Sequence, residues 1–291
     1  MFNVRPQQTI RRPIEVVGYG YWSGKEVHVE FRPAAVGTGI TFVRDDMGPE
    51  ASIPGRVEYR TEVPRRTNLS SGGAGVEMVE HIMAALSGLQ IDNCEVGVDQ
   101  AEMPGCDGSA IEFVDALISV GIEQQGEEVA QLEITETLRL TSGAAWIEAH
   151  PVADGSYSVA FELDYPEDSV IGRQSAALEM NSDEFCREVA PCRTFVLQRE
   201  ADEMIRRGLG THVTPRDLLI FGDQGVVGNQ LRFENECARH KALDLIGDMA
   251  LTGHAIIGRI VAYRSGHKLN AALAQELVTS FASVAAVRAT A

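Results

Sequence analysis

Hydrophobic and polar positions alternate with a period of two along three consecutive stretches near the N-terminus: residues 14–24, 26–34 and 37–44. A period of two puts neighbouring side chains on opposite faces of a strand, so the pattern predicts antiparallel strands. The period then changes. Within residues 77–89, four hydrophobic side chains recur at helical spacing, Val79, Ile82, Met83 and Leu86. This spacing predicts a helix that ends at Gly88.

A strand at residues 94–105 and a second helix at 109–121 follow, with Ser109 as the expected N-cap. The chain then becomes polar and acidic at residues 123–131 (EQQGEEVAQ) before strand-like sequence resumes. Such a shift is typical of a domain boundary. We therefore expect one domain at residues 1–125 and a second at 126–291.

The second half repeats the first in outline. Its pattern predicts strands at residues 132–151, 157–165 and 255–263, an irregular segment at 210–217, and helices that begin near Ser182, Glu234 and Lys268. In each half, a helix with a histidine near its start ends in glycine and precedes a strand. The pattern indicates a duplicated α+β unit.

Composition narrows the classes of function. The 291 residues are 44% hydrophobic and 23% charged, as in a folded globular protein. The excess of 42 acidic over 25 basic residues, a net charge of −17, argues against nucleic acid as a partner, and an anionic substrate would need local Arg and Lys. We expect no membrane span and a cytoplasmic location, because no signal-like or membrane-length apolar run occurs. Five cysteines without a C-x-x-C pair suggest reduced thiols.

A histidine, a lysine and two aspartates interrupt an otherwise apolar helix at residues 239–248, RHKALDLIGD. His240 and Asp244 are four residues apart, so they share one helix face, and Asp248 continues that stripe by one turn. A neutral imidazole beside a carboxylate suits zinc or ferrous iron. A catalytic site commonly uses three protein ligands, so a third ligand must come from elsewhere in the chain.

The best candidate for that ligand is His81, in the segment VEHIMAAL. Its neighbour Glu80 could take a proton from a metal-bound water molecule. In SGHKLN, a turn before a helix could hold His267 as an acid or as a cation that stabilises negative charge, with Asp248 as its orienting partner.

Each signal also has an ordinary explanation. The H-x-x-x-D spacing often occurs by chance, and a purely structural pair would bind no stoichiometric metal. Glu80 could simply face the helix dipole, and His81 could be satisfied by a backbone carbonyl. Lys241 alone is typical of a solvated helix surface, and Thr194 of a hydroxyl near a strand.

Five segments nevertheless occur in a family-like order over nearly the whole chain: VEHIMAALSGLQIDN, DGSAIEFV, CRTF, LRFENECARHKALDLIGD and GHAIIGRIVAYRSGHKLN. Together they resemble the UDP-3-O-acyl-N-acetylglucosamine deacetylase family, zinc amidases that commit a precursor to lipid A synthesis. The resemblance implies two α+β domains, each a layer of mostly antiparallel strands on a layer of helices, with the metal in the cleft between them. It also implies a monomer.

The resemblance assigns roles to individual residues. It implies zinc, with ferrous iron as the alternative, bound by His81, His240 and Asp244. Glu80 would be the general base, and His267, supported by Asp248, would protonate the leaving amine or stabilise the oxyanion. Three further residues would face the reaction: Thr194 at the oxyanion, Lys241 as added positive charge and Phe195 against the sugar.

The implied reaction is hydrolytic deacetylation of UDP-3-O-(3-hydroxyacyl)-N-acetylglucosamine to the free amine and acetate. Two alternatives are a deacetylase of a different N-acetylated sugar nucleotide or glycolipid, and a catalytically silent module that binds a sugar nucleotide or lipid. The chain differs from the family pattern in two segments, GYWSG and RGLGTHVTPRDLLIF. Both lie where the family senses the acyl chain rather than at the metal.

Overall fold

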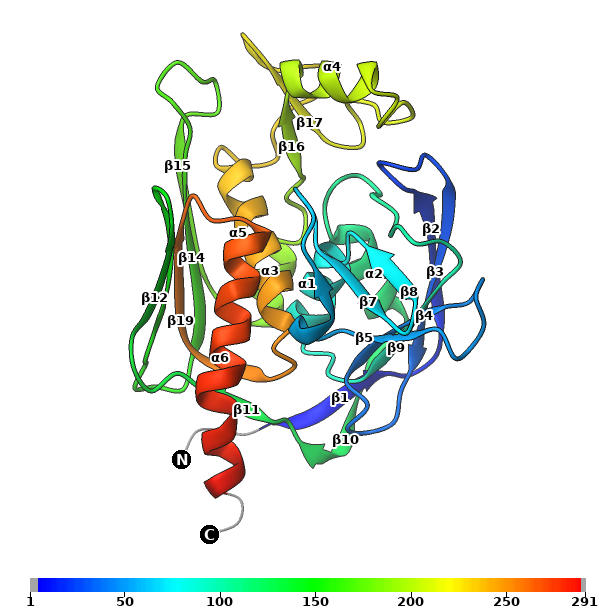
Figure 1. Cartoon of the computed structure of the whole chain (residues 1–291), viewed down its shortest axis with the longest axis vertical. Helices are drawn as coiled ribbons and strands as arrows, with labels where there is room; N and C mark the ends of the chain where they lie inside the picture. The colour runs from blue at the N-terminus through cyan, green and yellow to red at the C-terminus, as the bar shows by residue number, and fades with distance from the viewer. Residues whose placement is uncertain (1–4, 289–291) are drawn as a thin grey trace.

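The computed structural model describes the backbone of residues 5–288 and the side chains of residues 5–281. Figure 1 shows two sheets on opposite sides of the molecule with the helices between them. Most strand pairs are antiparallel, so the fold is α+β, as the hydrophobic pattern predicts.

The N-terminal sheet has five strands in the order β2 (Ile14–Tyr19), β3 (Glu26–Pro33), β9 (Cys94–Val98), β4 (Ile40–Arg44) and β5 (Ser52–Pro54). Its centre is β9, which pairs antiparallel with β3 and parallel with β4. Strand β3 buries every second side chain, Val27, Val29 and Phe31. One face of the sheet therefore joins the core, as expected from the period of two.

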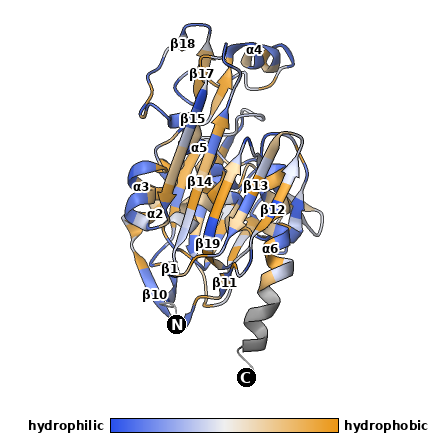
Figure 2. Cartoon of the chain, turned by 90° about the vertical axis from the view of Figure 1, so that its left-hand side faces the viewer, coloured by the Kyte–Doolittle hydropathy of each residue, from blue (hydrophilic) through white to orange (hydrophobic). Residues whose placement is uncertain are grey.

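The C-terminal sheet follows the same plan. Its main path is β12 (Leu138–Ser142), β13 (Ala145–His150), β19 (Ala255–Tyr263), β14 (Tyr157–Asp164) and β15 (Arg173–Glu179), with β11 (Gln131–Glu133) beside β19. The central β19 pairs antiparallel with β13 and parallel with β14, as β9 does with β3 and β4. Figure 2 looks onto this sheet, whose strands carry alternating hydrophobic and hydrophilic residues. The two sheets thus share one strand order, as a duplicated α+β unit predicts.

The helices between the sheets are α1 (Glu80–Gly88), α2 (Ile111–Val120), α3 (Ser182–Glu188), α5 (Glu236–Ala250) and α6 (His267–Arg288). Helix α5 packs on β14 and β15 and also on α1 and α6, which explains why it is buried on nearly every side. Gly247 permits the contact between α5 and α1, because a Cβ there would lie only 2.1 Å from the carbonyl oxygen of Glu80. No helix of the described residues is long and apolar enough to cross a membrane.

An insert after α3 forms the upper part of Figure 1. It consists of β16 (Phe195–Leu197), α4 (Gln198–Arg206), β17 (Leu219–Gly222) and β18 (Gly225–Val226). A second small sheet precedes α1, with β6 (Arg60–Thr61), β7 (Asn68–Ser71) and β8 (Ala74–Glu77), and a short 3-10 helix, η1 (Val57–Tyr59), leads into it. The sequence pattern did not predict α4 or these short strands.

Helix starts lie close to their predicted positions, with one correction. Helix α3 begins at Ser182, α5 at Glu236 and α6 at His267. The expected N-cap Ser109 is wrong by one residue, because Ala110 occupies that position. Ser109 is instead part of a local turn in which its backbone N–H donates to Asp107, although its own hydroxyl still accepts the N–H of Ile111.

The first strand of the chain pairs with the segment that joins the two halves. Strand β1 (Pro6–Ile10) pairs with β10 (Ile122–Glu128), and the predicted boundary between residues 125 and 126 falls inside β10. That division into domains stays a prediction.

Candidate active site

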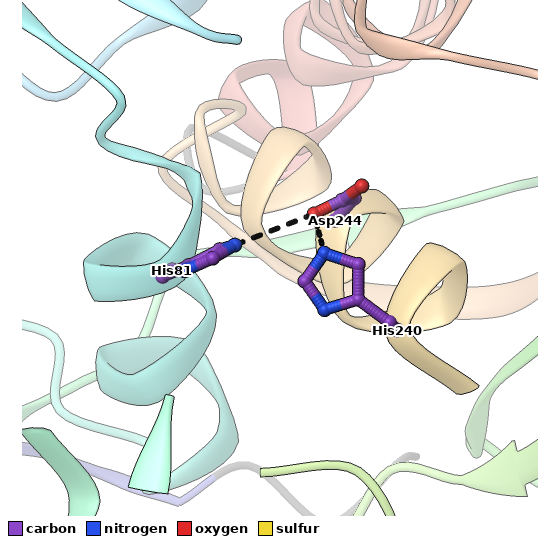
Figure 3. Close-up of side chains that lie close together, drawn as sticks. All are labelled: His81, His240 and Asp244. Atoms are coloured by element: carbon purple, nitrogen blue, oxygen red, sulfur yellow. Dashed lines mark ion pairs between the residues drawn. The ribbon is translucent and has the colours of Figure 1, made fainter. Parts of the chain in front are cut away.

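Two helices from opposite halves of the chain bring three ligand-type side chains together. His81 comes from the first turn of α1, and His240 and Asp244 come from successive turns of α5 (Figure 3). Asp244 Oδ1 lies 3.3 Å from His240 Nε2 and 3.8 Å from His81 Nε2. A tetrahedral ion with bonds of about 2.0–2.1 Å separates its ligands by about 3.3 Å. Among the described residues, this is the one group of three or more His, Asp, Glu or Cys side chains that could hold a metal ion.

The protonation states of the three side chains suit a cation. Burial and the neighbouring His240 lower the pKa of His81 to about 3, and burial also lowers the pKa of His240. Burial alone would raise the pKa of Asp244, but Lys241 and the surrounding histidines lower it far below its usual range. Near neutral pH the group therefore offers two neutral imidazoles and a carboxylate, a donor set that fits zinc or ferrous iron.

A backbone contact orients His240. Its Nδ1 lies 3.0 Å from the carbonyl oxygen of Cys192 and donates to it, so Nε2 keeps its lone pair on the side of Asp244. A buried ion pair holds that carbonyl in place. The side chain and backbone N–H of Arg193 both donate to Glu236, the first residue of α5, and both residues are buried.

Glu80 and His267 lie beside the group formed by His81, His240 and Asp244. His267 Nε2 is 3.9 Å from Glu80 Oε1 and 3.9 Å from Asp244 Oδ2. Burial raises the pKa of Glu80 to about 7. Burial would lower the pKa of His267, but the carboxylate of Asp248, 2.9 Å from Nδ1, together with Glu80 and Asp244 outweighs it and raises the pKa to about 9. A buried carboxyl group, Glu80, and a buried cation, His267, thus lie next to each other beside Asp244.

The remaining predicted residues surround this point. Lys241 Nζ donates to Asp244 Oδ2 at 2.5 Å, so its charge is directed at a ligand rather than at solvent. Thr194 lies immediately before β16 and lines the same cavity as His81 and Asp244. Phe195 also lines it, and its ring centroid is 6.4 Å from that of His240 in an edge-on arrangement.

This cavity has a volume of about 1220 Å³ and two kinds of wall. Near the metal-type ligands it is polar. Toward the insert it is lined by apolar side chains: Ala201, Met204, Ile205, Leu209, Val213, Leu218 and Ile220. Four further cations line it although the chain is strongly acidic: Arg65, Arg199, Arg264 and Lys268.

The two segments in which the chain differs from the family pattern contact each other. The hydroxyl of Tyr21, in GYWSG, donates to the carbonyl oxygen of Asp217 and lies 3.2 Å from that of Gly105. Gly24, in the same turn, packs on His212, with only 2.5 Å between a Cβ at this position and the imidazole. The turn between β2 and β3 therefore contacts the insert that forms the apolar wall of the cavity.

Sequence reasoning missed Thr67 and Asn270, which hold Asp248, the partner of His267. Both are fully buried, and both donate to the carboxylate of Asp248. Asn270 stands three residues after His267, so its spacing on the helix was a usable signal. Thr67 lies far from Asp248 in the sequence, and no local pattern could have found it.

Comparison with known proteins identifies the family to which the chain is similar. The sequence profile of the family described as UDP-3-O-acyl N-acetylglycosamine deacetylase matches residues 7–279. The chain is 36% identical to the UDP-3-O-acyl-N-acetylglucosamine deacetylase of Acidithiobacillus ferrooxidans over 94% of this chain and 90% of that protein. The enzymes of the same name from Chlamydia abortus and Shewanella violacea are each 35% identical, over 94% of this chain and over 97% and 89% of their own lengths. The chain therefore belongs to the UDP-3-O-acyl N-acetylglycosamine deacetylase family.

Proposed function

We propose that the protein is a zinc-dependent amidohydrolase that removes the N-acetyl group of UDP-3-O-(3-hydroxyacyl)-N-acetylglucosamine and releases acetate. This is the committed step of lipid A synthesis. One observation carries the proposal: His81, His240 and Asp244 converge on the wall of a cavity in which Glu80 and His267 face the same point. A pure binding module needs no base and acid beside its ligands.

The donor set favours zinc, with ferrous iron as the alternative. When bound, the metal would polarise the acetamide carbonyl and lower the pKa of water. Cys192 and the Arg193–Glu236 pair keep His240 in the tautomer that leaves Nε2 as a ligand.

Glu80 acts as the general base and takes a proton from water at Oε1. Its pKa of about 7 is close to that of an efficient base at neutral pH. His267 acts as the acid and gives the proton on Nε2 to the leaving nitrogen. Its raised pKa keeps that proton in place until the C–N bond breaks, and Asp248 fixes the ring from the other side.

Three residues act on the substrate rather than on the proton. The Thr194 hydroxyl stabilises the negative charge that develops on the carbonyl oxygen. Lys241 adds positive charge on the same side, and Phe195 packs against the sugar ring. Arg65, Arg199, Arg264 and Lys268 provide the cations that a diphosphate requires. The apolar wall between α4 and β17 suits an acyl chain.

The test measures acetate release from UDP-3-O-(3-hydroxyacyl)-N-acetylglucosamine by zinc-loaded protein, with chelator-treated protein as the control. We expect turnover that disappears with the metal and returns when zinc is added back. Glu80→Gln should lose roughly 10²- to 10⁴-fold in kcat and still bind one metal ion per chain.

Two results would contradict the proposal. Metal binding without acetate release from this substrate would favour another N-acetylated sugar nucleotide or glycolipid, or a silent binding module. Turnover that survives complete removal of the metal would exclude the metal-dependent reaction.

A further inference from the structure

Thr67 lies immediately before β7 and has no exposed surface. Its hydroxyl is 2.6 Å from Asp248 Oδ1 and 3.2 Å from His267 Nδ1. The first of these distances is the shorter, and the carboxylate can only accept, so the hydroxyl proton goes to Asp248. Its oxygen then remains available to the N–H of His267.

The backbone of Thr67 is held as firmly as its side chain. Its N–H donates to Glu80 Oε2 at 2.9 Å, and its carbonyl oxygen accepts the N–H of Val79 at 3.1 Å. These two bonds fix the residue against the start of α1. The first of these bonds also occupies Oε2 of Glu80, which leaves Oε1 as the oxygen that faces His267.

The two oxygens of Asp248 have separate partners. Oδ2 accepts from His267 Nδ1 and from Asn270, each at 2.9 Å, whereas Oδ1 accepts from Thr67. Asp248 has no exposed surface, so water cannot easily reach it. If one of its hydrogen-bond donors is removed, a carboxylate oxygen is left without a partner, and this costs free energy. Among the described residues, the Thr67 hydroxyl is the one side chain that donates a hydrogen bond to Oδ1. It thereby sets the rotation of the carboxylate that orients His267.

We propose that Thr67 is a positioning residue of the deacetylation reaction, whose hydroxyl orients the Asp248–His267 pair toward the base Glu80. The proposal rests on the function proposed above. Thr67 does not line the cavity, and its hydrogen bonds go to Glu80 Oε2, Asp248 Oδ1 and His267 Nδ1 rather than to Glu80 Oε1 or His267 Nε2. It acts through Asp248 and His267, and its backbone bond to Glu80 holds the acid and the base in one relative position.

The experiment compares Thr67→Val, which keeps the branched shape and the backbone N–H, with Thr67→Ser, which keeps the hydroxyl. In zinc-loaded protein, Thr67→Val should lose roughly 10-fold or more in kcat for acetate release, as outer partners of catalytic groups commonly do. KM should stay within about 2-fold and one metal ion should remain bound, because no substrate contact or ligand changes. Thr67→Ser should recover most of the lost kcat.

Thr252→Val is the matched control. Thr252 is also fully buried, and its hydroxyl donates to the carbonyl oxygen of Met249, away from the cavity. Its loss should lower the melting temperature and leave kcat unchanged. In a His267→Ala background, Thr67→Val should cost little further activity, because the group through which it acts is gone.

A proton NMR measurement decides the proposal without turnover. The hydrogen-bonded Nδ1–H of His267 should give a far-downfield resonance, assigned by its absence in His267→Ala and shifted or lost in Thr67→Val. An unchanged resonance, or an unchanged kcat in Thr67→Val, would overturn the proposal. Equal losses in the Val and Ser variants, matched by their melting temperatures, would also overturn it, since a structural role alone predicts them. A wild-type protein that releases no acetate would contradict the proposed function instead, and the resonance would still decide the role of Thr67.

Discussion

Replacing Gly247 with alanine should push α1 and α5 apart and weaken the proposed metal site without changing any of the three side chains proposed as ligands. The added Cβ would lie 2.1 Å from the carbonyl oxygen of Glu80, and the next contacts are also backbone atoms of that residue. An ordinary contact begins near 3.4 Å, so one helix must move by about 1.3 Å. Backbone atoms cannot swing aside as a flexible side chain does, so the helices themselves have to separate.

That movement is large on the scale of a metal site. His81 lies next to Glu80 on α1, whereas His240 and Asp244 lie on α5, so the shift separates one ligand from the other two. Metal–ligand distances tolerate about 0.2 Å. A displacement of about 1 Å at a catalytic group can cost about 10²-fold in rate. We expect Gly247→Ala to lose at least that factor in kcat/KM, with overpacking costing about 1–3 kcal/mol of stability.

The assay measures zinc affinity by competition with a chelator, acetate release and the melting temperature, with Gly126→Ala as the control. Gly126 lies in β10, and a Cβ there would meet no atom within 4 Å. The control should match the wild type in all three measurements. A Gly247→Ala protein with wild-type zinc affinity and wild-type turnover would refute the reasoning, because it would show that the site does not depend on this close approach.

Two further predictions concern the pH dependence of stability and the apolar wall of the cavity. In the metal-free protein, His267 has a pKa raised from 6.5 to about 9, so its contribution to stability is complete below pH 6.5 and disappears as the pH rises through 9. Chemical denaturation should show that the free energy of unfolding of the metal-free wild type declines over this pH range, and that His267→Ala flattens the decline. Parallel curves of unfolding free energy against pH for the two proteins would refute the assignment. Tyr21→Phe removes the hydrogen bond to Asp217 and should raise KM by about 2- to 10-fold for a substrate with a 3-O-acyl chain. An equal rise for a substrate without that chain would show that this turn does not affect acyl recognition.

Much of the fold follows from local patterns. The period-two burial of β3 depends on which side chains face the core, and that is encoded residue by residue. In β4 the two buried residues, Phe42 and Val43, are consecutive, so there the alternation expected from the sequence does not hold. Helix α4 was missed although Ala201, Met204 and Ile205 recur at helical spacing, because the helix is short, its other residues are polar and none of its residues is buried. The short strands β6 and β16 were missed because they hold too few residues to show a period.

The sequence by itself determined the long helices and strands, the α+β class and the pairing of His240 with Asp244, because an i, i+4 spacing on one helix is a local property. Only the tertiary structure decided how His81 meets that pair, through the glycine contact between α1 and α5. It likewise decided the position of Thr67, 181 residues from its partner Asp248. Hydrogen bonds and helix contacts depend on distances of a few ångströms in space. Residues far apart in the sequence reach such distances only when the two halves of the chain have packed together, so the sequence alone does not show which of them will meet.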